Sequence, residues 1–161
     1  MRKLIIGLCL LCVTLVAHAQ FEQGKWIVNP SITGLNLSHS KITGTEFGLT
    51  GQVGAFLVDN VALMVSLAGE WTDNYNICGA GVGGRYYFDT VGVYVGGGLE
   101  VARLKLDGFE SETNFGALAE VGYAFFITKT ITIEPAVYYN WNFDHSDLSK
   151  YGLKVGFGIY F

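Results

Sequence analysis

The sequence is poor in cysteine, proline and charged residues, and these scarcities exclude several classes of protein. Its 161 residues, a length that suits one domain, include 3 Cys and 2 Pro, and charged residues make up 15% of the chain. The low proline content and the absence of a Gly-X-Y period exclude a collagen-like chain and low-complexity disorder. Glycine is nevertheless abundant, at 22 residues, which is about double its usual share of ~7%.

Long apolar runs are also missing beyond the first twenty residues. Apolar residues make up 50% of the chain and aromatic residues 14%, yet no later run reaches the roughly 18 residues that a transmembrane helix needs. An apolar and aromatic chain without such a helix is typical of a membrane β-barrel.

The first nineteen residues predict a secretory signal peptide. Arg2 and Lys3 precede an apolar stretch at 4–16, and the small-x-small site at 17–19 follows it. We expect cleavage after Ala19, which makes 1–19 the signal peptide and 20–161 the mature barrel domain.

Cleavage at this site changes the thiol content and the charge. It removes Cys9 and Cys12, so Cys78 remains alone and no intramolecular disulfide is expected. It also removes two cations and no acid, so the formal net charge moves from −4 to −6. The phosphate backbone repels so acidic a chain, and we therefore expect no nucleic-acid partner.

From Gly24 onward the apolar residues recur with a period of two, which predicts strands. Each strand has about a dozen residues, enough for the roughly 9–11 that cross a bilayer. Short connections alternate with longer polar ones, as in the up-and-down barrels of outer membranes. We predict an all-β, eight-stranded antiparallel transmembrane barrel with strands at 24–37, 45–57, 61–72, 77–88, 91–103, 113–126, 131–142 and 150–161. Pro30 and Pro135 fall inside strands, where we expect β-bulges.

The charges inside these strands share one face. Successive side chains of a strand point to opposite sides of the sheet, and the large apolar residues take the other side. The charges on the shared face are Glu46, Glu70, Arg85, Glu100, Glu120, Glu134 and Lys154.

Two observations favour a lumen for the charged face and lipid for the apolar one. Glycine crowds the charged face, where a narrow barrel needs space between opposing side chains. The apolar face carries aromatic residues near both strand ends, as two membrane interfaces require. These girdle residues are Trp26, Tyr86, Phe88, Tyr123 and Phe125 near the tight turns, and Phe47, Trp71, Phe115, Tyr139 and Trp141 near the longer loops. The alternative is a soluble, lipocalin-like ligand-binding barrel with its charges outside.

The last strand carries the most specific pattern. Its outward residues are Tyr151, Leu153, Val155, Phe157, Ile159 and Phe161. With the signal peptide and the eight strands, it resembles the small outer-membrane barrels of the OmpX type and of the OmpA transmembrane domain. The resemblance implies a monomer in the bacterial outer membrane, surrounded by lipid. It also implies that the barrel-assembly machinery reads the closing strand as an insertion signal.

Three functions remain for such a barrel. The charged lumen is either a structural core of paired charges or, because Glu outnumbers the cations, a narrow cation-attracting pore. A lipid A-modifying enzyme would need a lipid-facing His and Ser on one strand face, whereas His39-Ser40 and His145-Ser146 are adjacent pairs in loops. We expect a structural or small porin-like protein without catalysis, cofactor or metal, and we interpret His39 and His145 as exposed loop residues.

Overall fold

The computed structural model describes residues 21–33, 47–72, 75–88, 91–106, 112–144 and 149–161. Within these residues the chain forms strands and turns, and no helix is long and apolar enough to cross a membrane. The strands are β1 (Trp26–Thr33), β2 (Phe47–Val58), β3 (Val61–Thr72), β4 (Tyr75–Phe88), β5 (Val93–Leu106), β6 (Glu112–Tyr123), β7 (Phe125–Phe126), β8 (Ile131–Asn142) and β9 (Lys150–Tyr160).

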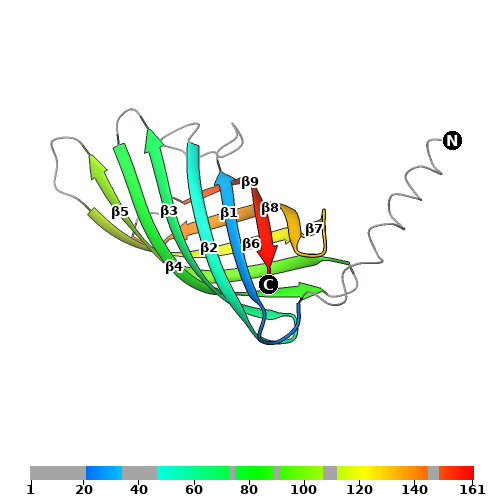
Figure 1. Ribbon diagram of the computed structural model, residues 1–161. Coiled ribbons are helices and arrows are strands. Elements are labelled where there is room, and N and C mark those ends of the chain that lie inside the picture. Colours follow the sequence, from blue (N-terminus) through cyan, green and yellow to red (C-terminus); the bar gives the residue numbers. More distant parts are fainter. Residues whose placement is uncertain (1–20, 34–46, 73–74, 89–90, 107–111, 145–148) are drawn as a thin grey trace.

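The strands form one antiparallel sheet that closes on itself (Figure 1). Neighbours in the sheet follow the chain from β1 to β6, β9 pairs with β1 and β8, and β8 pairs with β6. The short β7 continues β6 along the same partner, β8. The predicted eight-stranded antiparallel barrel is therefore confirmed, with β6 and β7 together forming its sixth strand.

The two prolines interrupt the ladders without shifting them. Pairing between β6 and β8 ends at Gly122 opposite Ala136 and resumes at Phe125 opposite Ile133 in the same register. The two rungs left out contain Pro135, which has no N–H to donate. The ladder between β1 and β9 likewise lacks its rungs at residues 29 and 30 while keeping its register. The predicted bulges at Pro30 and Pro135 are wrong, because a missing donor opens a rung without requiring an extra residue.

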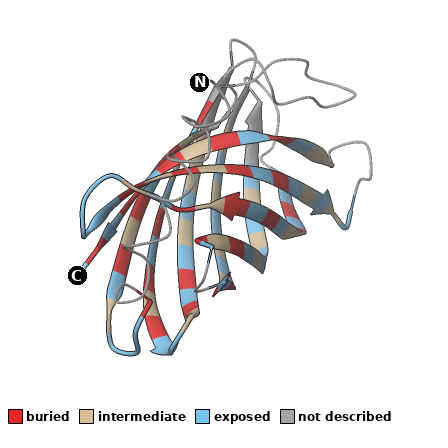
Figure 2. Ribbon diagram, turned by 90° about the vertical axis from the view of Figure 1, so that its right-hand side faces the viewer, coloured by how far each residue is buried: buried red, intermediate tan, exposed pale blue. Residues whose placement is uncertain are grey.

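Buried and exposed residues alternate along the strands (Figure 2), so the two faces of the sheet differ sharply in exposure. Large apolar side chains cover the outside, and Leu67 and Leu99 are 66% and 61% exposed. Polar and charged side chains lie inside, where Arg85 and Glu134 are 2% and 1% exposed. In water this arrangement would leave a continuous apolar surface uncovered, whereas a lipid bilayer covers it.

Glycine allows β4 and β5 to lie very close together on the lumen side of the wall. A Cβ atom at Gly98 would lie 2.6 Å from the carbonyl oxygen of Val82 and 2.8 Å from the Cα atom of Gly83. At Gly96 it would lie 2.8 Å from Cγ of Glu120, inside the lumen. These glycines therefore leave space for the neighbouring strand β4 and for the buried side chain of Glu120.

Candidate functional site

Arg85 of β4 lies at the centre of the lumen and contacts residues from several strands. Its Nε donates to Oε1 of Glu120 (2.9 Å) on β6, and its Nη1 donates to Oε2 of Glu134 (3.0 Å) on β8. Its Nη1 also donates to the Tyr87 hydroxyl (3.0 Å), and its Nη2 donates to Oε1 of Gln52 (2.6 Å) on β2. All three guanidinium nitrogens are thus satisfied, as a buried cation requires.

Glu134 is the matching anion, and both of its oxygens accept two hydrogen bonds. Oε1 accepts from the hydroxyls of Thr132 (2.8 Å) and Tyr160 (2.6 Å). Oε2 accepts from Nδ2 of Asn29 (2.6 Å) and from Arg85. Four donors use the roughly four lone-pair positions of a carboxylate. The donors come from β1, β4, β8 and β9, so Glu134 joins distant parts of the wall.

Lys154 and Glu120 complete a balanced group of charges. Lys154 of β9 donates to Oε2 of Glu120 while Arg85 occupies Oε1. We name Arg85, Glu120, Glu134 and Lys154 the charge cluster. Its members are 5% exposed or less, and their formal charges sum to zero. The ring of Tyr94, 4.2 Å from Cζ of Arg85, adds a cation–π contact.

Aromatic rings fill the lumen at the end with the tight turns. We name Phe21, Phe56, Tyr87, Phe126 and Tyr160 the aromatic floor. Phe21 stacks on Tyr87 with ring centroids 4.3 Å apart, and its ring lies 5.7 Å from those of Phe126 and Tyr160. Since Tyr87 and Tyr160 also bond the charge cluster through their hydroxyls, the floor and the cluster are continuous.

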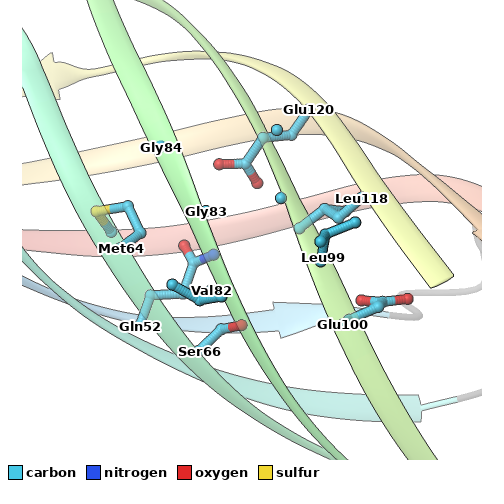
Figure 3. Close-up of a pocket in the computed structure, with 12 residues that line it drawn as sticks. Gln52, Met64, Ser66, Val82, Gly83, Gly84, Leu99, Glu100, Leu118 and Glu120 are labelled. Carbon is cyan, nitrogen blue, oxygen red and sulfur yellow. The ribbon is translucent and has the colours of Figure 1, made fainter. Parts of the chain in front are cut away.

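A small cavity lies on the other side of the charge cluster (Figure 3). The space that water can enter is about 20 Å³, room for about one water molecule. Gln52, Met64 and Ser66 line it on β2 and β3, and Glu100 and Glu120 line it on β5 and β6. Its lining includes no residue of the aromatic floor, so this space stops at the level of Glu120.

The predicted lumen charges have different positions. Four of them form the charge cluster, and Glu100 lines the cavity. Glu70 lies in β3, paired with Gly48 and Ile77 through the backbone. Glu46, His39 and His145 lie outside the described residues.

The predicted girdle residues with described side chains lie on the outer face, either exposed or half-buried. Neighbouring rings on β4 pair edge to face, with the centroids of Tyr86 and Phe88 5.0 Å apart. Tyr123 and Phe125 are 4.1 Å apart beside the break between β6 and β7. The backbones of Phe47 and Trp71 are register partners in the β2–β3 ladder.

The closing strand alternates as its sequence suggests. Tyr151, Leu153, Phe157, Ile159 and Phe161 are exposed on the outer face, and Val155 is half-buried. Trp26 and Phe161 exchange two backbone hydrogen bonds, of 2.8 and 3.1 Å, across the seam between β1 and the chain end. The role of these residues as an insertion signal stays a prediction.

Several lumen residues were not identified from the sequence as site residues. Asn29, Phe56 and Thr132 have the inward parity, which is the signal that could have found them. Phe21 precedes the first strand, so no strand period could have placed its ring in the lumen.

Comparison with known proteins agrees with this architecture. Residues 5–161 match the family described as outer membrane protein beta-barrel domain, and no curated protein matches the chain. Similar solved structures include Neisserial surface protein A, with 17% sequence identity, a TM-score of 0.68, and coverage of 86% of this chain and 98% of that one.

Two further structures share the fold. The N-terminal β-barrel domain of Pseudomonas aeruginosa OprF has 17% identity and a TM-score of 0.69, over 86% of this chain and 98% of that one. The attachment invasion locus protein Ail of Yersinia pestis has 13% identity and a TM-score of 0.54, over 86% of this chain and 99% of that one. The family match and the apolar outer face contradict the alternative of a soluble, lipocalin-like barrel, which would carry its charges outside. The chain belongs to the outer membrane protein β-barrel domain family and is a transmembrane barrel of the bacterial outer membrane.

Proposed function

We propose that this protein is a sealed, non-catalytic structural barrel whose lumen is a packed ionic core and not a permeation path. The observation that carries the proposal is the charge cluster, in which Arg85 and Lys154 neutralise Glu120 and Glu134. A permeating ion would have to break several charge-assisted hydrogen bonds at once, and each of these is worth about 1.5–3 kcal/mol.

The aromatic floor supports the same proposal from the other end of the lumen. Five rings pack where a pore would open between the tight turns. The alternative of a cation-attracting pore requires excess negative charge along an open path. Two of the acids on which it depends are instead paired with buried cations.

The pairing of these acids also argues against catalysis. A general base must be able to take up a proton from a substrate within hydrogen-bond reach. Glu134 accepts four protein donors and Glu120 is held by Arg85 and Lys154, so neither offers a free oxygen in the described lumen.

The outer face and the closing strand of the barrel indicate its partners, which are lipid and the barrel-assembly machinery. The exposed apolar belt fits the hydrocarbon of outer-membrane lipid, and the closing strand 150–161 fits recognition by the barrel-assembly machinery through strand pairing. A monomer is sufficient, because each strand position around the described barrel has a paired neighbour on both sides, with β6 and β7 together forming one strand.

Planar-bilayer recording of the purified, folded protein tests the proposal. We expect no steady conductance across repeated insertions, with insertion verified by the gel shift between unheated and boiled samples. A wide porin in the same bilayers serves as the positive control. A reproducible, cation-selective steady current from the unmodified protein would overturn the proposal in favour of the pore.

A further inference from the structure

The residues just before β1 fold back under the barrel. The N–H of Lys25 donates to the carbonyl of Glu22 (3.3 Å), and Gly24 has a φ of +88°, a left-handed conformation that suits glycine. Two further backbone hydrogen bonds, Gly24 N–H to Phe56 and Phe56 N–H to Lys25, each of 2.9 Å, fix the turn to the start of the wall. The chain therefore reverses direction at the mouth between the tight turns.

The turn between β2 and β3 holds the reversed segment in place. The N–H of Asn60 donates to the carbonyl of Phe21 (2.7 Å), and the N–H of Gln23 donates to Oδ1 of Asp59 (2.9 Å). Asn60 has a φ of 67°, which directs its carbonyl to the N–H of Tyr87 (2.9 Å). One short turn thus links the N-terminal segment to β4.

Only one side chain of this segment enters the lumen. Phe21 is 2% exposed, whereas Glu22 and Gln23 are exposed. Its ring touches the floor rings of β2, β4, β7 and β9, which come from all around the wall. Phe21 therefore occupies the centre of the mouth, with the hydroxyls of Tyr87 and Tyr160 and the charge cluster behind it.

We propose that residues 21–25 are a built-in plug, seated by Phe21, that keeps water at this mouth away from the charge cluster. The segment belongs to no strand, so leaving the mouth breaks its own hydrogen bonds with Phe56 and with the β2–β3 turn while the ladders between the strands stay intact. The plug closes the lumen from one end only, and the charge cluster closes it further in. The inference rests on the proposed closed lumen and adds a removable part to it.

Thiol accessibility tests the plug independently of conductance. Ala62 faces the lumen with no exposure and pairs with Phe56 and Arg85, so Ala62→Cys reports on the space behind the plug. Cys78→Ser removes the exposed native thiol. The probe is a trimethylammonium methanethiosulfonate, applied to the folded protein in detergent micelles, where both mouths are accessible.

With native Phe21 we expect slow labelling of the reporter. Phe21→Ala should raise the rate about tenfold or more, because the buried ring is what holds the segment in the mouth. Glu22→Ala, at the exposed neighbour, should leave the rate unchanged. If Phe21→Ala does not give the heat-dependent gel shift of a folded barrel, Phe21→Leu replaces it and should give an intermediate rate.

Equal labelling rates with and without the Phe21 ring would overturn the plug, as would fast labelling of the reporter with Phe21 present. The closed-lumen proposal would survive either result if the unmodified protein still passed no current. A steady current combined with a Phe21-dependent labelling rate would overturn the closed lumen and retain the plug.

Discussion

The ion pair between Glu120 and Lys154 allows the electrostatics of the lumen to be tested by a double-mutant cycle. Glu120→Gln leaves Arg85, Lys154 and Glu134, so the charge cluster gains a net charge of +1. Lys154→Met leaves it at −1, and the double variant is neutral again with Arg85 paired to Glu134. The cycle therefore separates the cost of a lost contact from the cost of an unbalanced buried charge.

The structure ranks the two single variants. Breaking a buried pair by removing one partner costs about 3–5 kcal/mol, since the other charge stays uncompensated. Lys154→Met should lie near the lower end, because Glu120 keeps its contacts with Nε and Nη2 of Arg85. Glu120→Gln should lie near the upper end, because Lys154 loses its ion-pair partner and Arg85 loses one of its two. The double variant should cost less than the sum of the singles by about 1–3 kcal/mol.

Urea unfolding of the barrel in lipid vesicles measures these free energies by linear extrapolation. Tryptophan fluorescence is a suitable signal, since the chain has 3 Trp and none is changed. The exposed acid Glu22 supplies a matched control, and Glu22→Gln should change the unfolding free energy by less than about 0.5 kcal/mol. Single-variant losses below about 1 kcal/mol, or losses that simply add, would refute the claim that this lumen depends on charge balance.

Three further predictions concern the wall. Gly98→Ala should destabilise the barrel by about 1–3 kcal/mol, because its Cβ would meet the β4 backbone. Gly97→Ala, with its nearest neighbour 3.6 Å away, should be nearly neutral in the same urea assay, and equal effects would contradict the close approach of β4 and β5 at Gly98. Leu99→Arg on the lipid face should cost about 2–4 kcal/mol of unfolding free energy, because Leu99 is exposed at the middle of β5. A neutral result would contradict a lipid-facing outer surface at this position. Deleting Phe161 removes both hydrogen bonds with Trp26 and should lower the outer-membrane yield, measured by fractionation and heat-shifted gels, more than Lys154→Met does; equal yields would count against its role in assembly.

The sequence contained enough information to predict the barrel and the direction of its faces. Strand parity is a strict property of the backbone, so Arg85, Glu120, Glu134 and Lys154 had to share a face once the strands were found. Glycine content and the aromatic residues near the strand ends then indicated which face points inward. Parity does not predict which residues of two neighbouring strands pair with each other. The bulges predicted at Pro30 and Pro135 were wrong for that reason, since the register continues past both prolines.

Partner choice inside the lumen could not be predicted. Which acid meets Arg85 depends on barrel stagger and on side-chain reach across the lumen, and neither is visible in a single strand. Asn29 shows the difficulty, since its amide bonds Glu134 on β8, two strands away along the sheet. The position of Phe21 could not be predicted either, because it depends on a chain reversal before the first strand.

The composition of the charge cluster has a consequence for the order of folding events. Its members lie on β4, β6, β8 and β9, and the hydrogen bond from Asn29 to Glu134 joins residues 105 positions apart. The ion pair of Lys154 with Glu120 needs β9, and the contact of Asn29 with Glu134 needs β1 to be joined to β8 through β9. These two contacts form only after the last strand has docked, so they contribute little to a transition state in which the barrel is still open. Lys154→Met should then accelerate unfolding while leaving the folding rate nearly unchanged. The buried charges would thus act chiefly on the lifetime of the inserted barrel, which makes them a source of kinetic stability.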